Sequence, residues 1–172
     1  VGGLRLASSD SAVVQGNVIG TDATDTLDLG NGTGVEIHAG GALVGTAEPG
    51  GLGANVIAHN VLGITSSPIF SGNILRGNSI HDNKVLGISL STNVPTANDV
   101  GDVDTNQQNF PIVSSAVPEG SGVRVIGTLD TTASGTFNLD FYENPGCSRL
   151  PHDFLQGGKW IGTKPVTTAR SA

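Results

Sequence analysis

Short segments that alternate apolar and polar residues recur along the first half of the chain, each opening on a glycine. Segments of this kind begin at Gly3, Gly34, Gly63 and Gly87. A repeat of about 20–50 residues is typical of solenoid folds, and alternation within a short β-branched segment predicts a strand. We therefore expect one strand per repeat, stacked on the equivalent strand of the next repeat.

Two further columns of strand-like residues recur between these segments. One column opens on asparagine, at Asn17, Asn55 and Asn78, and the other has apolar pairs at 13–14, 43–44 and 74–75. Three recurring columns predict about three and a half coils of a parallel β-helix over residues 1–92. Turn-rich insertions near residues 22–33 and 46–54 should project from it as loops.

Alternation also predicts which side chains face the interior of the coils. Side chains of a strand point alternately to its two faces, so one inward residue of each repeat should stack on its equivalents. The predicted stack contains Leu4, Val35, Ile64 and Ile88. At the bends, the pair Asn60 and Asn83 and the Asn17 column should form ladders, in which each amide bonds the backbone and the Asn of the next coil.

The chain changes character after residue 92. Residues 93–111 are polar and rich in turn formers, which predicts a linker or cap. Four alternating segments follow, at 112–117, 123–129, 136–142 and 160–167, with 123, 125, 127 and 137, 139, 141 as the expected inward sets. Four strands are fewer than the roughly seven of a complete immunoglobulin-type sandwich. The predicted antiparallel β-sandwich-like module of residues 112–172 is therefore either incomplete or packed on the end of the helix, covering its last coil.

Charge and composition exclude several kinds of partner. The formal net charge is −7 at pH 7, which disfavours binding to the phosphate backbone of a nucleic acid or to an anionic membrane surface. No apolar run approaches the roughly 18 residues that would span a bilayer, so no membrane insertion is expected. Cys147 is the only cysteine, so neither an internal disulfide nor a cysteine-based metal site is possible.

Three stretches carry a family likeness: NVIGTDATDTLDLGNGTGVEI, ALVGTAEPGGLGANVIAHN and NDVGDVDTNQQNFPIV. They resemble the right-handed parallel β-helix repeats of large secreted or surface-exposed bacterial proteins, and NVIGTD and QNFP are their more specific pieces. In such proteins the helix runs into a short β-sandwich-like module, which GTLDTTASGTFNLDFYENPGC resembles. The resemblance covers roughly residues 1–147. It implies an all-β fold and an extracellular or cell-surface location, but no single chemistry.

The strongest catalytic candidates are Glu36, His38 and Ser67. Glu36 and His38 alternate onto one outward face, with Cα atoms about 6.5–7 Å apart, and Ser67 falls beside His38 in the next coil. An acid, a base and a hydroxyl are the ingredients of nucleophilic hydrolysis. The simpler interpretation is a solvated sheet face, in which Arg5 pairs with Glu36 across coils for less than about 1 kcal/mol. No G-x-S-x-G motif occurs in the chain.

Asp99, Asp102 and Asp104 are the candidate metal ligands. Hard carboxylate oxygens at this spacing could bind Ca²⁺. The segment lacks both the D-x-[DN]-x-[DN]-G pattern and the closing glutamate of an EF-hand loop, so a solvated acidic turn is the simpler interpretation.

These features together predict a structural or adhesive segment of a secreted or cell-surface bacterial β-helix protein, with polysaccharide or cell-surface glycan as the expected contact. The alternative is an enzyme that uses the face around Glu36 and His38: an extracellular hydrolase, either an esterase or glycan-active, or a polysaccharide lyase. The residues leave open whether the protein is an enzyme. Unpaired strand edges at the open end near Val1 also predict a risk of homotypic association.

Overall fold

The structure, a computed structural model, describes residues 2–7, 11–46, 52–91, 94–104, 106–144, 146 and 156–169. Cys147 lies outside the described residues. The described part is all-β: it contains strands and turns, without a helix. Accordingly, it offers no helix with the length and hydropathy needed to cross a membrane.

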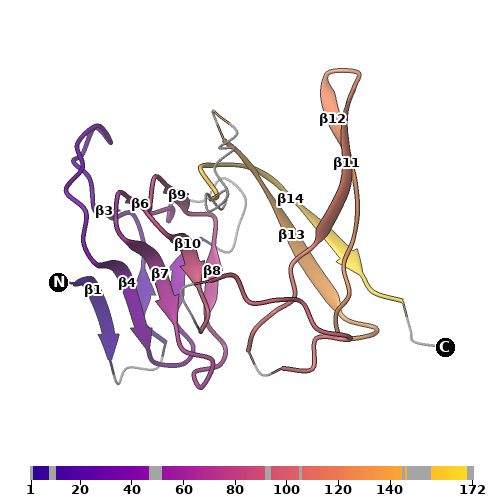
Figure 1. Cartoon of the computed structure of the whole chain (residues 1–172), viewed down its shortest axis with the longest axis horizontal. Coiled ribbons are helices and arrows are strands. Elements are labelled where there is room, and N and C mark those ends of the chain that lie inside the picture. The colour runs from indigo at the N-terminus through magenta and orange to yellow at the C-terminus, as the bar shows by residue number, and fades with distance from the viewer. Residues whose placement is uncertain are drawn as a thin grey trace.

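The N-terminal half forms three parallel sheets, which lie to the left in Figure 1. Sheet A contains β1 (Gly2–Ala7), β4 (Thr33–His38), β7 (Leu62–Ser66) and β10 (Leu86–Ser89). Sheet B contains β2 (Val13–Val14), β5 (Leu43–Gly45) and β8 (Ile74–Arg76). Sheet C contains β3 (Val18–Ile19), β6 (Val56–Ala58) and β9 (Ser79–His81). The chain visits A, B and C in the same order three times and then enters A once more, at β10; we call each such passage a coil.

The pairing register confirms the three predicted columns. In sheet A, Leu4 pairs with Val35, Val35 with Ile64 and Ile64 with Ile88. In sheet C, Ile19 pairs with Ile57 and Ile57 with Ile80, and sheet B keeps its predicted pairs as well. Each coil thus places the same kind of residue above its equivalent in the coil before.

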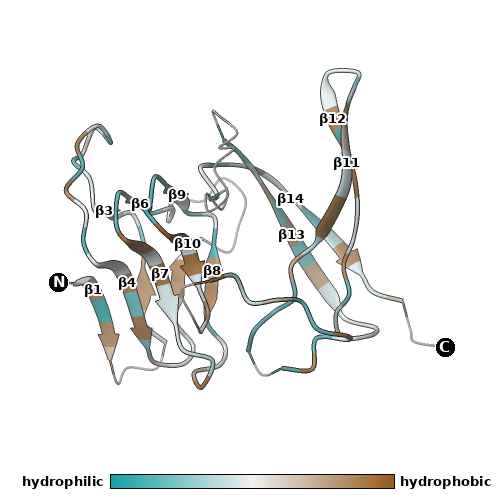
Figure 2. Cartoon of the chain, viewed as in Figure 1, coloured by the Kyte–Doolittle hydropathy of each residue, from teal (hydrophilic) through white to brown (hydrophobic). Residues whose placement is uncertain are grey.

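The interior of these coils is the apolar core of the molecule. Its buried members are Leu6, Val14, Val35, Ile37, Ala42, Val44, Ile57, Ile64 and Ile80. Figure 2 shows brown residues alternating with polar ones along these strands. Ile88 belongs to the same stack but is 38% exposed, because no further strand of sheet A covers it.

Two asparagine ladders run along the edges of the coils. Asn17 donates from its backbone N–H and from Nδ2 to Oδ1 of Asn55, both at 3.0 Å, and Asn55 makes the same two bonds to Asn78. The second ladder joins Asn31, Asn60 and Asn83 in the same direction. Asn55 and Asn60 are completely buried. Burial of such amides is tolerated only when their hydrogen bonds are made, and the ladders make them.

The C-terminal half forms two antiparallel pairs of strands. One pair is β11 (Ile112–Glu119) with β12 (Gly122–Thr128), and the other is β13 (Thr136–Glu143) with β14 (Lys159–Thr167). The predicted strands agree with these bounds to within two residues. The inward assignment of Val123 and Val125 was wrong: they are 63% and 40% exposed, and among the described strands the β11–β12 pair is a sheet of its own.

Candidate functional site

The outward face of sheet A brings Glu36 and His38 together. Their side chains project from β4, and His38 Nε2 lies 2.9 Å from Glu36 Oε1. Arg5 Nε lies 3.6 Å from Glu36 Oε2, as predicted from the register. The hydrogen bond from His38 is the main cause that lowers the pKa of Glu36, with a smaller contribution from the charge of Arg5. Phe70 meets the His38 ring edge-on, with centroids 6.2 Å apart.

Ser67 lines the same shallow groove as Glu36 and His38. The groove measures about 190 Å³, and Ser89 and Ser91 of the next coil also line it. Within the described part of the chain, however, no hydrogen bond joins Ser67 to His38; the imidazole contacts Glu36 instead. The three residues are neighbours without the hydroxyl–imidazole bond of an activated nucleophile.

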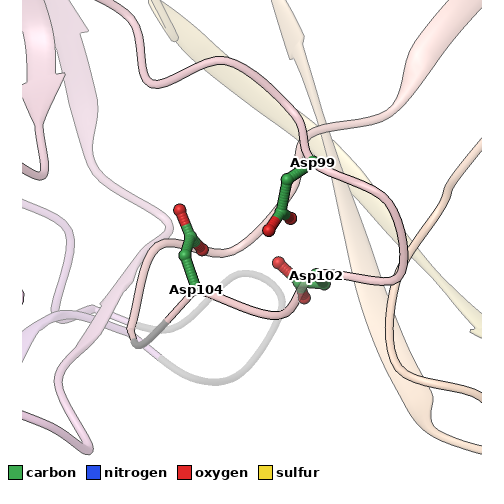
Figure 3. A group of neighbouring side chains, drawn as sticks. All are labelled: Asp99, Asp102 and Asp104. Atoms are coloured by element: carbon green, nitrogen blue, oxygen red, sulfur yellow. The ribbon is translucent and has the colours of Figure 1, made fainter.

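The predicted metal ligands also come together, in the linker between the two halves. One oxygen from each of Asp99, Asp102 and Asp104 lies within 4.8 Å of the others, and Figure 3 shows their carboxylates gathered beside one loop. Asp102 is held by three donors: the Asn109 N–H at 2.8 Å, and Gln108 Nε2 and the Thr131 hydroxyl at 2.6 Å each.

Asp99 and Asp104 are each satisfied on one oxygen only. Asp99 Oδ2 accepts from Val103 N–H, and Asp104 Oδ2 accepts from Gln107 Nε2. The Oδ1 atom of each is sealed from solvent and has no hydrogen-bond partner among the described residues. Desolvation, followed by the charges of Asp99 and Asp102, raises the pKa of Asp104. A buried anionic oxygen without a partner is costly, and a divalent cation would satisfy both oxygens.

Asn109 anchors this linker, and the residue types alone did not reveal it. Asn109 is 4% exposed and accepts from Asp99 N–H at 3.0 Å. Its Nδ2 donates to the carbonyl oxygens of Asp99 and Asp130, at 2.7 and 2.8 Å. One amide therefore ties the acidic loop to the segment that follows β12. The available signal was the QNFP piece, which carried the family resemblance but suggested no role.

A second polar cluster joins the first inserted loop to the end of sheet C. His81 Nε2 lies 3.0 Å from Asp25 Oδ2, and its Nδ1 lies 2.8 Å from Asp82 Oδ2. The His59 ring stands edge-on to His81, with centroids 6.4 Å apart. Both ring nitrogens of His81 already have carboxylate partners, so the cluster attaches the loop to the sheet.

A bidentate ion pair joins β8 to β13, which lie far apart in the sequence. Arg76 donates from Nε and Nη2 to the two oxygens of Asp140, at 2.7 and 2.6 Å, and the Thr163 hydroxyl adds a third donor to Asp140 at 2.5 Å. The side chains of Arg76 and Asp140 are only 21% and 12% exposed. Burial raises the pKa of Asp140, but its hydrogen bonds from Arg76 and Thr163, with the Arg76 charge, outweigh burial and lower that pKa overall. Bidentate pairing of this kind is among the stronger polar contacts in proteins.

Residues just before β14 occupy the position that a further coil would take. Gln156 Oε1 accepts from Asn83 Nδ2 at 2.8 Å and from Asn83 N–H at 3.2 Å, and thus replaces the next asparagine of the ladder. Ile80 N–H donates to the Gly157 carbonyl at 2.8 Å. Beside them, the Tyr142 hydroxyl accepts from Gly77 N–H at 3.1 Å. The last coil is therefore covered on sheets B and C by residues that follow it by more than 60 positions.

An open cleft of about 2250 Å³ remains between the last coil and the two antiparallel pairs, with Ile88 and Phe137 among its lining residues.

The chain matches no protein-family model, and searches of curated proteins and of solved structures found no match.

Proposed function

We propose that the protein is a structural segment: a right-handed parallel β-helix of about three and a half coils, closed at one end by the antiparallel strands that follow it. The ordered visits to sheets A, B and C and the two asparagine ladders support the helix. A right-handed crossover is the rule for parallel strands joined within a sheet. Solenoids need such ends because a terminal repeat otherwise leaves its core and its strand edges uncovered.

One observation carries this proposal: Gln156 continues the asparagine ladder beyond Asn83. The ladder is thus closed by a specific contact with a glutamine from a distant part of the chain. The ion pair between Arg76 and Asp140 holds β13 against the same end of the parallel sheets. The β13–β14 pair and the residues before β14 thus act as a cap, and we use that name for residues 136–143 and 156–167.

The setting that fits this scaffold is a secreted or cell-surface one, with adhesive contact to polysaccharide or surface glycan. The net charge of −7 supports solubility and disfavours anionic partners. The outward groove supplies the hydroxyl groups of Thr65, Ser67 and Ser91, which could hydrogen-bond neutral sugars. We would test this contact by comparing the binding of the protein and of Ser91→Lys to a panel of neutral polysaccharides. Equal binding of both proteins would show that the groove is not the site of glycan contact.

Hydrogen exchange tests the capping role. The variant D140R/Q156A places Arg against Arg76 and removes the acceptor of Asn83, so amides of β8, β9 and β10 should exchange faster while β4 and β5 keep their protection. Glu143→Arg is the matched control: it makes the same charge change on β13, at an exposed residue that pairs with Lys159 of the cap itself. Unchanged exchange of β8–β10 in D140R/Q156A would refute the capping role.

A second function, hydrolysis at the Glu36 and His38 face, rests on the 2.9 Å contact between them. It requires turnover of an ester or a polysaccharide by the purified protein and loss of about 10²–10⁴ in rate in His38→Ala. Turnover that His38→Ala leaves intact would place any active site elsewhere.

We further propose that the linker is a calcium-stabilised element of the scaffold. The two partnerless oxygens of Asp99 and Asp104, together with Asp102, supply hard ligands of the kind that Ca²⁺ prefers. Main-chain carbonyls and water would complete the six to eight ligands that this ion takes. A thermal-shift test follows in the Discussion.

A further inference from the structure

The outer edge of β12 has no neighbouring strand among the described residues, because β11 and β12 form a sheet of two strands. Every residue of β12 is exposed, and in Figure 1 the pair extends beyond the other strands at the top of the view. An exposed strand edge pairs readily with another chain unless a proline, a bulge or charged side chains block it.

The two outer edges of this pair differ in how they are protected. β11 carries Pro118 and an irregularity in register between Val113 and Ser115, and a proline leaves the edge without one of its donors. β12 contains neither a proline nor a bulge. Its one charged residue, Arg124, lies 3.3 Å from the carboxylate of Glu119 on β11. The β12 edge is therefore unprotected, and its charge is neutralised within the pair.

Alternate residues of β12 turn their backbone groups towards this free edge. Pairs in an antiparallel ladder alternate between hydrogen-bonded and non-hydrogen-bonded ones, and Val123 lies opposite Pro118, which has no N–H to donate. The Ile126 carbonyl accepts from the Ser114 hydroxyl at 3.1 Å and so faces β11. Alternation then directs the N–H and C=O groups of Val123 and Val125 outward, where another strand can bind them.

We propose that the β12 edge pairs antiparallel with the β12 edge of a second copy of this chain, with the two-fold axis at Val125. In this register Val125 meets its own equivalent, Val123 meets Gly127, and these pairs exchange their N–H and C=O groups. Arg124 meets Ile126 of the second copy. An axis at Arg124 would instead oppose two like charges, which is destabilising. The contact is the same on both copies, so it closes as a dimer.

A second copy fits this edge better than a charged strand does. Arg124 already has its carboxylate, so the edge offers no free charge to an acidic or a basic segment. Its exposed side chains include the apolar Val123, Val125 and Ile126, and β12 is itself a neutral strand of that composition. Pairing also joins two isolated pairs of strands into one sheet, and a sheet needs three or more strands for independent stability.

Sedimentation velocity of the unaltered chain, from about 1 μM to about 1 mM, tests this pairing. One strand from each copy makes an interface of the small, weak class below about 1,200 Å². The mass should therefore rise with concentration from 17.3 kDa towards twice that value and stop there. Val125→Pro removes an outward N–H and spares the ladder bonds to β11, so it should stay monomeric. Ala116→Pro is the matched control, because Ala116 lies opposite Val125 with its N–H at the other edge, and it should still form the dimer.

Charge reversal tests the position of the two-fold axis without a proline. Val125→Lys and Val125→Glu should each stay monomeric alone, because two like charges would meet across the axis. An equimolar mixture of the two variants should form a dimer with one copy of each, because opposite charges then meet.

Four results would overturn the proposal: an unaltered chain that stays monomeric over the whole range, or grows beyond a dimer; a Val125→Pro variant that dimerises like the unaltered chain; an Ala116→Pro variant that keeps its β-sheet circular dichroism but loses the dimer; or a charge mixture that associates no more than its components. If either proline variant loses its β-sheet circular dichroism, the charge pair decides alone.

Discussion

The parallel sheets and the β11–β12 pair use the same kinds of residue to opposite effect. In the parallel region Val35, Ile57 and Ile64 are completely buried, whereas in the pair Val123 and Ile126 are 63% and 47% exposed. A strand in the coils has neighbours above, below and across the core. A strand of the isolated pair has a single partner, and a two-stranded hairpin is marginal in water.

The difference shows that alternation specifies a strand but does not bury it. Repetition supplies burial in the coils, because each inward residue finds its equivalents on the neighbouring coils. The β13–β14 pair lies between these extremes: Phe137, Leu139 and Phe141 are half-buried, and this pair is the one fastened to the last coil. Predictions that change one region while leaving the other intact test this account.

The largest effect should come from the core of the coils. Ile57→Ala removes a completely buried side chain and leaves a cavity, so the free energy of unfolding should fall by about 2–5 kcal/mol. Ile126→Ala makes the same chemical change in the β11–β12 pair, where the side chain is 47% exposed, and should cost less than about 1 kcal/mol. Chemical denaturation measures both, and equal losses would contradict the comparison.

A ladder asparagine should matter more inside the stack than at its end. Asn60→Ala leaves the donors of Asn31 without their acceptor and removes the bond to Asn83 in a buried setting, which should cost about 2–3 kcal/mol. Asn17→Ala removes an exposed side chain at the end of the ladder, which donates to Asn55 and whose Oδ1 accepts from no described group; its cost should stay below about 1 kcal/mol. The denaturant midpoints of the two variants measure these losses. An equal shift would mean that burial does not determine how much a ladder asparagine contributes to stability.

Most of the coil architecture could be predicted because it is periodic. The pairing of Leu4 with Val35 and the stacking of Asn55 on Asn78 follow from residues that recur at similar spacing. Asn31 escaped prediction as the first residue of the second ladder, since the insertion before it obscures the repeat.

Covering of the last coil was one of two alternatives that the sequence left open, but the contacts that make it could not be predicted, because they join residues that no repeat relates. Arg76 reaches Asp140 across 64 positions, and Asn83 reaches Gln156 across 73. At the candidate sites, short spacing was sufficient: it brought Asp99 near Asp104 and Glu36 near His38. It could not reveal which carboxylate oxygens lack donors, since that depends on Gln107, Gln108 and the fold of the whole loop.

The calcium proposal predicts a smaller effect, confined to the linker. Millimolar Ca²⁺ should raise the melting temperature of the unaltered chain by a few degrees, as expected for a ligand that binds only the folded state. The pKa of Asp104 is raised in the folded chain, so its charge opposes folding near neutral pH and this cost is relieved as the pH falls. Asp104→Asn should therefore melt slightly higher than the unaltered chain in EDTA and gain nothing from Ca²⁺.

Differential scanning fluorimetry in EDTA and in Ca²⁺ measures these shifts. Glu119→Gln is the control, because it removes one exposed carboxylate whose ion pair among the described residues is with Arg124 of the β11–β12 pair. It should retain the full response to Ca²⁺. A response that survives in Asp104→Asn, or that Glu119→Gln also loses, would show that the ion binds elsewhere or acts by screening.

The smallest effect should be a weakening of the contact between the cap and the last coil at acid pH. The folded-state pKa of Asp140 lies below its ordinary value, so the carboxylate stabilises the folded chain above the ordinary pKa of about 3.9. This stabilisation declines below that pH and is lost as the pH falls through the lowered value, where protonation weakens the pairing with Arg76.

Exchange of the Ile80 amide, which bonds Gly157, should then accelerate beyond its intrinsic pH dependence, while the Ile57 amide inside the stack should not. In Asp140→Asn the excess acceleration should be absent, since no charge remains to be titrated. If the excess acceleration of Ile80 exchange persists in Asp140→Asn, another group causes the acid sensitivity of the capped end. The Arg76 contact would then not be what distinguishes the capped end from the interior of the stack.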